Sequence, residues 1–358
     1  MAKRTTKSEN GKQVLVTAKD RVFVGLDVHK KSYHAAVRIN GREITTRVLA
    51  PTAEAVLVFL EPYRSGRLHV VYEAGPTGFA LVRALREAKV SADVIAPSKT
   101  PQTPAKANKT DRLDCRQLTF YDEKAMLKTV AVPTVEEEAD RQVIRLRDQV
   151  VDARRRIKQQ IKSFLLQHGV AQPAGLANWS NESVEMLRQL PLVAPLRFCL
   201  DAMVAELKDF DERLGQVNRE IERLSQTPRH AEAVTRLRKY SGVGVITAMQ
   251  YRTEVFRPGR FANGRQVAAY LGLAPRVSES GERHRTGPLL KAGHGRLRAL
   301  LVEAAWVWIR SDETAKATFK RLLQNTAQPN KAITGMARRL AIQLWRTLVP
   351  PEERRGAA

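Results

Sequence analysis

Four carboxylates in this sequence have the types and positions needed to hold metal ions. Asp27 lies in the apolar run VFVGLDVHK, and Glu73 lies near the end of a second apolar run, HVVYEAG. Asp111 and Asp114 lie in KTDRLD, three residues apart, and therefore share one face at the start of a helix. Carboxylates at the ends of core strands are costly to bury unless positive charge balances them. Divalent cations, Mg²⁺ or Mn²⁺, would balance them, because these ions take carboxylate oxygens and complete their shell with phosphate.

Each acid taken alone also has an ordinary structural explanation. Asp27 can cap a turn at the end of its strand. Asp111 can be a helix N-cap, and the helix dipole favours Asp114 in the first turn. The presence of all four acids favours metal binding over these explanations, although the capping and metal-binding roles are compatible.

The charge of the chain indicates a polyanionic partner. Lys and Arg number 61 against 37 Asp and Glu in 358 residues, for a net charge of +24. Nucleic acid is the first candidate for such a partner, before a membrane. No apolar stretch reaches the length of a transmembrane helix, the basic N-terminus lacks the apolar region of a signal peptide, and two cysteines are too few for a disulfide framework. We therefore expect a cytoplasmic protein without membrane contact.

The elements that must position the acids form an α/β domain over residues 21–130, after a disordered basic N-terminus at 1–20. Alternating apolar runs predict the order βββαβαβ, and Asn40–Gly41 between two such runs is a strong hairpin signal. This order, with acids on the first and fourth strands, is that of a ribonuclease H-like sheet. A helix beginning near Asp111 closes the predicted site.

Residues 131–231 are predicted to form a helical coiled-coil region. Two seams of apolar residues are spaced by threes and fours, and a Pro/Gly/Asn-rich stretch, HGVAQPAGLANWSNES, joins them. An antiparallel helical hairpin fits this pattern, and amphipathic helices in an ordinary bundle fit it equally well. The seams are Val143, Leu146, Val150, Ala153, Ile157, Ile161 and Phe164, and then Met203, Leu207, Phe210, Leu214, Val217, Ile221 and Leu224.

Residues 232–350 are predicted to form a mainly helical C-terminal domain, followed by a tail at 351–358. Gly242 and Gly244 lie between two helical patterns, where free backbone N–H groups could take a phosphate, or where a tight turn could need glycine. The polar segment SESGERHRTG is expected to be a loop set against phosphate. The expected nucleic-acid contacts are Lys99, Lys106, Lys109, Arg112, Gly242, Gly244, Arg276, Arg283, Arg285, Lys291 and Arg296.

Six motifs occur together in an order that resembles the DEDD transposases of the insertion-sequence 110 family, also called bridge recombinases. They are GLDVHK, YEAGPTG, NKTDRLD, SGVGVITA, YLGLAPR…SG and KAGHGRLRALL…AA. The resemblance covers nearly the whole chain, and the full series is far more specific than any one motif. It implies a RuvC-like domain, a coiled coil and a C-terminal transposase domain that carries a serine nucleophile.

The resemblance also implies the parts of the reaction. Mg²⁺ would be held by the four acids, and Ser280, directly before Gly281, matches the position of the serine that forms a covalent phosphoserine link to DNA. This chain has Ser278–Glu279–Ser280 where relatives often have adjacent serines, so Ser278 is the alternative nucleophile, and the role of His294 stays open. The implied partners are donor and target DNA, a structured guide (bridge) RNA, and further copies of the chain in a dimer or tetramer.

The sequence therefore predicts an RNA-guided DNA recombinase of the prokaryotic cytoplasm, acting at the nucleoid. A metal-dependent nuclease or Holliday-junction resolvase that uses water as the nucleophile is the alternative enzyme. A non-catalytic nucleic-acid-binding scaffold is a third class, which the intact spacing of all four acids argues against. Because the acids and the serine lie far apart in the chain, the active site must be assembled between domains or between subunits.

Overall fold

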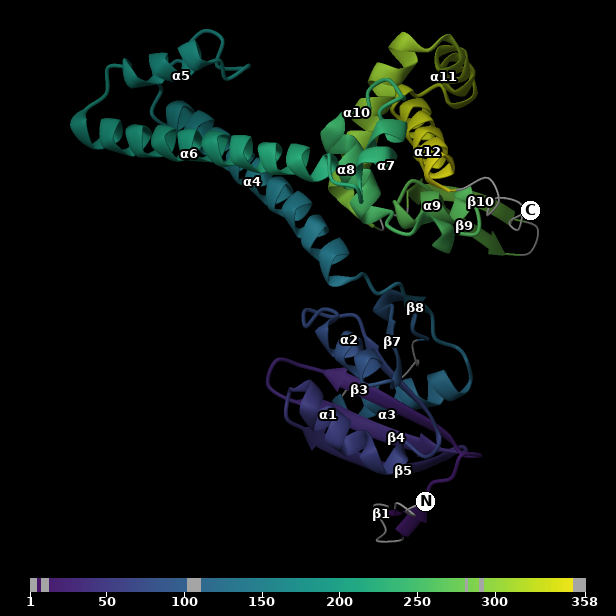
Figure 1. Ribbon diagram of the computed structural model, residues 1–358. Coiled ribbons are helices and arrows are strands. Elements are labelled where there is room, and N and C mark those ends of the chain that lie inside the picture. Colours follow the sequence, from purple (N-terminus) through teal and green to yellow (C-terminus); the bar gives the residue numbers. More distant parts are fainter. Residues whose placement is uncertain (1–4, 8–12, 102–110, 281–282, 290–292, 350–358) are drawn as a thin grey trace. The chain divides into compact units, whose positions relative to one another are not determined.

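The chain divides into two units, Met1–Pro133 and Thr134–Ala358 (Figure 1). Each unit has its own hydrophobic core. The structure is a computed structural model, and it describes residues 5–7, 13–101, 111–280, 283–289 and 293–349. The first unit ends three residues beyond the expected limit of 130. No separation into two units occurs near residue 231, where the sequence predicted a second domain boundary.

A six-stranded mixed sheet forms the centre of the first unit. Its spatial order is β5-β4-β3-β6-β7-β8, with β6 parallel to both β3 and β7 and the other neighbours antiparallel. The predicted order βββαβαβ is present, and Asn40 and Gly41 have the positive φ values of the expected hairpin turn. The strands are β3 (Arg21–Val28), β4 (Tyr33–Ile39), β5 (Arg42–Leu49), β6 (Arg67–Glu73), β7 (Ser91–Ile95) and the unpredicted β8 (Thr129–Val130).

Helices cover both faces of this sheet. On one face, Val22, Val24 and Leu26 of β3 pack with apolar residues of α1 (Ala53–Leu60) and α2 (Ala80–Glu87). On the other face lies α3 (Asp111–Glu123), whose Leu118 packs against strand residues of β6 and β7. The short 3₁₀ turns Glu61–Tyr63 and Pro97–Lys99 follow α1 and β7.

Helix α3 comes very close to the sheet because β3 carries glycine beneath it. A Cβ atom on Gly25 would overlap the carbonyl oxygen of Cys115 and lie 3.0 Å from the Leu118 Cβ. Any larger residue at this position would therefore push the helix away from β3.

The N-terminal segment differs in part from the expected disordered basic lead-in. A two-stranded antiparallel pair is formed by β1 (Thr5–Lys7) and β2 (Gln13–Leu15). Val16 is only 4% exposed and packs in the core of the first unit, where Gly66 leaves room for it. The short apolar run Val14–Leu15–Val16 explains the difference, because it brings an apolar side chain within reach of the sheet's core.

A long helical hairpin begins the second unit. The apolar seams pair α4 (Val135–Gln167) with α6 (Ala194–Ser225), and α5 (Asn181–Arg188) packs against their far ends. Ile157, Ile161 and Leu165 meet Leu200, Val204 and Leu207 in that distal core, whereas the predicted seam residue Leu146 is 45% exposed. Thr134 and Glu137 form a capping box that fixes the start of α4.

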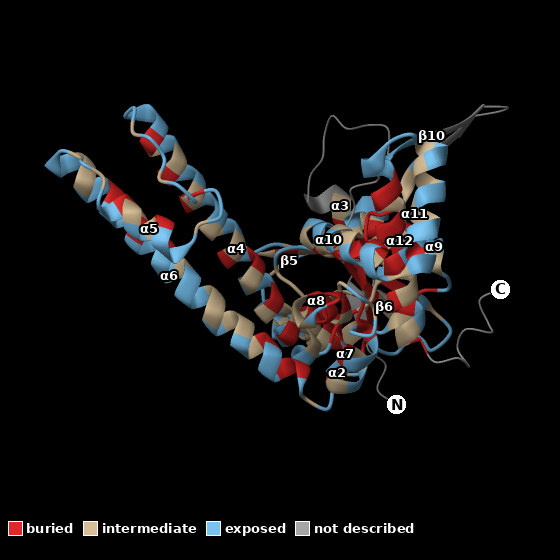
Figure 2. Cartoon of the chain, turned by 90° about the horizontal axis from the view of Figure 1, so that it is seen from above, coloured by how far each residue is buried: buried red, intermediate tan, exposed pale blue. Residues whose placement is uncertain are grey.

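The helices after residue 230 form the body of the second unit, and its core includes Ile144, Ile221 and Leu224 at the base of the hairpin. This shared core explains why no separate unit begins near residue 231. Figure 2 shows buried residues gathered where α8, α10 and α12 lie, and much of α6 exposed. The helices are α7 (Ala231–Leu237), α8 (Val245–Glu254), the 3₁₀ turn Pro258–Arg260, α9 (Gly264–Tyr270), α10 (Gly295–Ser311), α11 (Glu313–Thr326) and α12 (Pro329–Leu348).

The sequence predicted a loop for SESGERHRTG, but its described residues, 278–280 and 283–287, form strands, and residues 281–282 lie outside the described residues. Two antiparallel strands, β9 (Pro275–Ser280) and β10 (Arg283–Leu289), pair through most of it. Its polar composition hid the strands, because apolar alternation is the sequence signal of a half-buried strand and these residues lack it. None of the described helices is both long and apolar enough to cross a membrane.

The close approach at Gly25 predicts a specific weakness. Gly25→Ala should displace α3 and cost about 1–3 kcal/mol of local stability, because the new methyl group meets backbone atoms that cannot rotate away. Hydrogen–deuterium exchange of a peptide covering residues 111–123 should be faster in the variant. Gly75→Ala is the matched control, since a Cβ there meets nothing closer than 3.9 Å. Unchanged exchange in α3 of Gly25→Ala would contradict the packing argument.

Candidate active site

Two of the predicted acids lie side by side in the sheet of the first unit. Leu26 of β3 pairs with Tyr72 of the parallel strand β6, so Asp27 and Glu73 are the next residues on neighbouring strands. Gly25 and Val71, two residues before them, both lie on the face that α3 covers. Asp27 and Glu73 are partly exposed and share that face at the carboxyl ends of their strands.

Each of these two carboxylates has a polar neighbour that holds it. The Nε2 atom of His29 lies 3.0 Å from Oδ2 of Asp27, and the Oγ1 hydroxyl of Thr100 donates to Oε1 of Glu73 at 3.0 Å. Thr100 follows the 3₁₀ turn after β7, so a third strand end contributes to the site. No pattern in the sequence points to Thr100, because its contact with Glu73 depends on β6 and β7 lying next to each other.

The other two predicted acids begin α3. Asp111 is its first residue, with a side chain outside the described part, and Asp114 is partly exposed one turn later. Burial, and then the charge of Asp27, raise the pKa of the adjacent Cys115 thiol to about 11. Cys115, the neighbour of Asp114 in the chain, lies over Gly25, and Asp27 is two residues further along the same face of β3. The start of α3 therefore lies near Asp27.

The donor atoms of this site suit a hard divalent cation. Asp27, Glu73 and Asp114 offer carboxylate oxygens, the ligands that Mg²⁺ prefers. Among the described side chains, no group of three Asp, Glu, His or Cys residues lies close enough together to hold a metal ion. The side chain of Asp111 is outside the described part. The chemical type of the ligands therefore fits the metal, while a complete ligand set needs Asp111 or a shift of the start of α3.

A histidine fixes the far end of α3 to the sheet. His69 of β6 lies between two carboxylates, with Nδ1 2.7 Å from Oδ2 of Asp122 and Nε2 3.3 Å from Oδ2 of Asp93. The hydrogen bond with Asp122 is the main cause that raises the pKa of His69. Asp122 belongs to α3, so this contact helps to set the position of the helix that carries Asp111 and Asp114.

In the second unit, the predicted serines lie on a strand opposite predicted arginines. Ser280 of β9 pairs with Arg283 of β10, and Ser278 pairs with Arg285. The structure describes the backbone at these positions and not the side chains. The register brings both candidate serines and two predicted phosphate-binding residues into one short hairpin.

The segment after this hairpin is anchored by His294. Its Nδ1 accepts a hydrogen bond from the Leu297 N–H at 3.3 Å, so His294 is the N-cap of α10. Its Nε2 lies 3.5 Å from Oδ2 of Asp148 on α4, and Gln250 of α8 donates to the same oxygen at 2.9 Å. Burial raises the pKa of Asp148. His294 thus connects the start of α10 with Asp148 of α4.

The two glycines predicted to face phosphate have different surroundings. A Cβ on Gly242, whose φ is +87°, would collide with the backbone of Ala304, so a tight turn against α10 requires glycine there. Gly244 is the N-cap of α8, and a Cβ there would have nothing within 4 Å. The turn explanation accounts for Gly242, and Gly244 stays a predicted phosphate contact.

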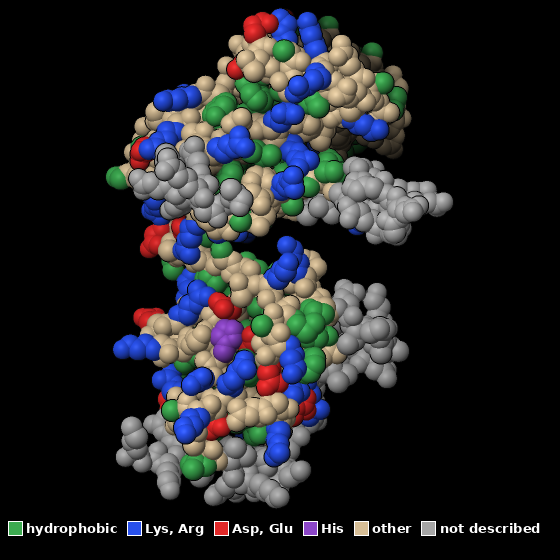
Figure 3. Space-filling model, turned by 90° about the vertical axis from the view of Figure 1, so that its right-hand side faces the viewer, with side chains coloured by type: hydrophobic (Ala, Val, Ile, Leu, Met, Phe, Trp, Pro, Cys, Tyr) green, Lys and Arg blue, Asp and Glu red, His purple; other side chains and the backbone are tan. Residues whose placement is uncertain are grey.

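The predicted basic contacts also differ in their surroundings. Lys99 and Arg276 are exposed, whereas the Nε of Arg296 lies 3.7 Å from Oδ1 of Asp148. Lys106, Lys109 and Lys291 fall outside the described residues, as do the side chains of Arg112, Arg283 and Arg285. Figure 3 shows Lys and Arg side chains spread over one face of the second unit, with few acidic side chains among them.

Comparison with known proteins identifies similar sequences for both units. Residues 24–170 match a DEDD transposase model of the IS110 group, and residues 234–320 match the model described as the transposase IS116/IS110/IS902 family. The two matched ranges include Asp27, Glu73, Asp111 and Asp114 in the first and Ser278 and Ser280 in the second.

Individual relatives cover most of the chain. The transposase y4qE of Sinorhizobium fredii is 31% identical to this chain over 311 residues. The match covers 84% of this chain and 75% of the length of y4qE. The transposase for insertion sequence element IS1111A of Coxiella burnetii is 26% identical over 71% of this chain and 70% of its own length. The transposase for IS1533 of Leptospira borgpetersenii is 27% identical over 80% and 85%.

The contact between His69 and Asp122 predicts that the stability of α3 depends on pH. Because its folded-state pKa is raised, His69 contributes its full stabilisation below the ordinary histidine pKa of about 6.5, and loses it as pH rises through the folded value. Exchange of α3 amides should therefore be faster in His69→Gln than in the native protein at acidic pH, and the difference should shrink at alkaline pH.

Comparing the two proteins at each pH removes the intrinsic pH dependence of exchange, which they share. His168→Gln is the control, because His168 is an exposed residue of the second unit. A native-to-variant difference that grows as the pH rises would show that the sign of the linkage is wrong.

Proposed function

The chain belongs to the IS116/IS110/IS902 family of transposases, and from this premise we propose that it cuts and rejoins DNA through a covalent phosphoserine intermediate, guided by a structured RNA. The observation that supports the proposal most is the placement of Asp27 and Glu73 at one register of neighbouring parallel strands, beneath the helix that begins with Asp111. A ribonuclease H-like, or RuvC-like, sheet would be expected to present its acids at this edge.

In the proposed site, Asp27, Glu73, Asp111 and Asp114 would hold Mg²⁺ or Mn²⁺. When bound, such an ion supplies Lewis acidity toward a phosphate and stabilises charge on the oxygens that enter and leave. The protein's own contribution is orientation. The Thr100 hydroxyl fixes one oxygen of Glu73, and His29 does the same for Asp27, in the manner of outer-shell groups at metal sites.

The proposed nucleophile is the hydroxyl of Ser280, with Ser278 as the alternative. Its Oγ forms a bond to the phosphorus of the scissile phosphodiester, the bond from phosphorus to the 3′-oxygen breaks, the serine gives up its proton, and the 3′-oxygen ends as a hydroxyl. Arginines 283 and 285 of the same hairpin would neutralise charge on the phosphate oxygens. The serine ester keeps the energy of the phosphodiester, so rejoining to another strand needs no ATP.

The proposed partners follow from charge and composition. A net charge of +24 suits several nucleic-acid strands at once, and aromatic residues make up only 6% of the chain. Base pairing by the guide RNA would then supply sequence specificity, while the protein recognises backbone shape and charge. The acids of the first unit and the serine of the second must act on one phosphodiester, within one chain or between copies in a dimer or tetramer.

The decisive experiment is an adduct assay with donor duplex, the RNA from the DNA flanking the gene, and Mg²⁺. The native protein should give a protein–DNA adduct on a denaturing gel, Ser280→Ala should lose it, and Ser278→Ala should retain it. Asp27→Asn should lose both adduct and cleavage while binding RNA as the native protein does. Cleavage without any adduct would replace the serine with water as the nucleophile, as in a nuclease or resolvase.

The hydrogen bond from Thr100 gives a second prediction. Thr100→Val keeps the shape of the side chain and removes the donor to Glu73, so the cleavage rate should fall about 10–100-fold, the usual cost of losing an outer-shell partner. Raising the Mn²⁺ or Mg²⁺ concentration should recover part of the loss. Ser98→Ala, two residues earlier and exposed, is the control and should cleave at the native rate. An unchanged rate in Thr100→Val would remove Thr100 from the site.

A further inference from the structure

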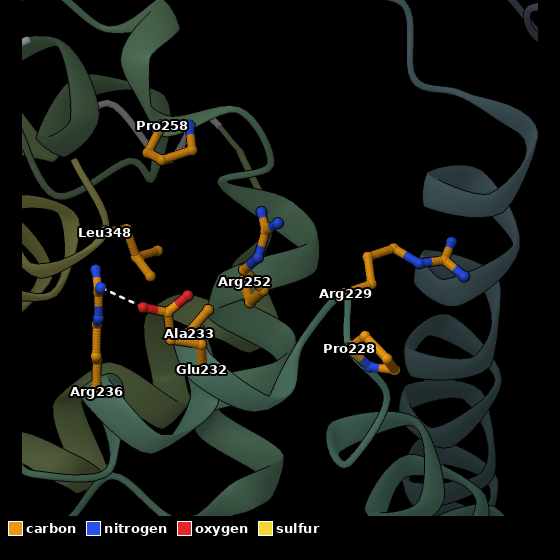
Figure 4. Close-up of a pocket in the computed structure, with 8 residues that line it drawn as sticks. All are labelled: Pro228, Arg229, Glu232, Ala233, Arg236, Arg252, Pro258 and Leu348. Atoms are coloured by element: carbon orange, nitrogen blue, oxygen red, sulfur yellow. Dashed lines mark hydrogen bonds and ion pairs between the residues drawn. The ribbon is translucent and has the colours of Figure 1, made fainter. Parts of the chain in front are cut away.

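A second basic site lies in the body of the second unit. A pocket of about 200 Å³ opens between α7, the end of α8, the 3₁₀ turn after it and the end of α12 (Figure 4). Its volume is several times that of a water molecule. Three arginines and one glutamate contribute to its wall, together with apolar groups, and the main lining residues are Arg229, Glu232, Arg236, Arg252, Pro258 and Leu348.

The guanidinium of Arg252 has a buried Nε–H group that makes no hydrogen bond within the described part of the chain. The side chain is partly buried, its Nε atom is shut off from solvent, and within the described part of the chain it makes no hydrogen bond or ion pair. Burial is the main cause that lowers its pKa. A buried charged donor without a partner is costly, and an arginine has five N–H groups to satisfy.

The acids nearest to Arg252 are occupied by other cations. Glu137 and Asp140 are the carboxylates whose charges act on it. Glu137 binds Arg257 at 2.8 Å, and Asp140 lies 3.1 Å from Nη1 of Arg229 and 2.9 Å from Nε2 of the buried His230. Neither acid therefore neutralises Arg252 within hydrogen-bond distance.

The other two arginines of the pocket are held in place by carboxylates. Arg229 is paired with Asp140 of α4, and Arg236 is paired with Glu232 one turn earlier on α7, as the dashed line in Figure 4 marks. Each guanidinium keeps further N–H groups beyond those that its carboxylate takes. Because Glu232 is 77% exposed, its charge is screened by water, and the pocket stays net positive.

We propose that this pocket binds a backbone phosphate of a nucleic-acid strand, with Arg252 as the anchor and Arg236 at its side. A phosphate offers several acceptor oxygens to the planar fork of arginine, which suits the unpaired donors of Arg252 better than one water molecule. The proposal rests on the proposed function in one respect, that the chain handles nucleic acid. It adds a contact apart from the four acids and the serine hairpin, at residues that the sequence analysis did not select.

The inorganic ion tests the pocket without any nucleic acid. Phosphate should raise the melting temperature of the native protein above the effect of chloride at equal ionic strength, and Arg252→Gln should remove most of that difference. Arg223→Gln is the control, because Arg223 is exposed and already paired with Glu220. Arg236→Gln provides a second pocket variant at a more exposed position if Arg252→Gln unfolds. An equal phosphate response in the native protein and both pocket variants would overturn the proposal.

A salt titration with nucleic acid then identifies the source of the phosphate. Fluorescent duplex DNA and an RNA hairpin are titrated separately against the native protein, Arg252→Gln, Arg236→Gln and Arg223→Gln. Loss of one phosphate contact should weaken binding by about tenfold and flatten the plot of log affinity against log salt by about one. The effect should occur with the strand type that occupies the pocket, and no effect with either type would contradict the nucleic-acid assignment.

The two proposals can fail separately. If the native protein forms no covalent adduct and cuts no DNA, the recombinase function fails, while phosphate and strand binding still report on the pocket. If instead the pocket variants bind both strand types with native affinity and salt dependence, the pocket assignment fails and the adduct assay is unaffected.

Discussion

The contact between α3 and Gly25 is the constraint on which the first unit's site depends. Only a residue without a side chain lets the backbone of Cys115 lie directly over β3, and this closeness brings the start of α3 to the strand ends that carry Asp27 and Glu73. At the other end of the helix, His69 links Asp122 to the sheet. The close packing at Gly25 and the contact between His69 and Asp122 together determine the position of α3. They therefore also determine where Asp111 and Asp114 lie.

The second unit uses buried carboxylates for the same purpose. Asp140, Ile144 and Asp148 follow one another at intervals of four residues on α4 and all face the body. Asp140 binds His230 and Arg229. Asp148 accepts a hydrogen bond from Gln250 and lies near His294 and Arg296. Removing all the partners of either acid would leave a buried charge unpaired, which is costly. These two acids therefore tie the helical hairpin to the elements that carry the serine hairpin and the arginine pocket.

Sequence reasoning succeeded where a local pattern has one physical cause. Apolar alternation and Asn40–Gly41 predicted the order of strands and helices along the chain in the first unit, and the position of Asp111 predicted the start of α3. It failed for β9 and β10, whose polar residues give no alternation, and for β1 and β2 in the segment expected to be disordered. It could not find Asp140 or Asp148, because an acid within a helical apolar pattern reads as a solvent-facing residue until its partners on other elements are known.

The sequence by itself determined which reactive groups the chain contains. These are four acids in strand and helix contexts, serines before a glycine, and a large excess of basic residues, in the motif order of a transposase family. These are properties of residue type and spacing along the chain. The tertiary structure alone decided which side chains act on one another. It lets Thr100 donate a hydrogen bond to Glu73 and brings His294 to the start of α10 and near Asp148. Within the described residues it leaves the Nε of Arg252, in its pocket, without a hydrogen bond. Contacts of that kind join residues distant in sequence, and only packing brings them together.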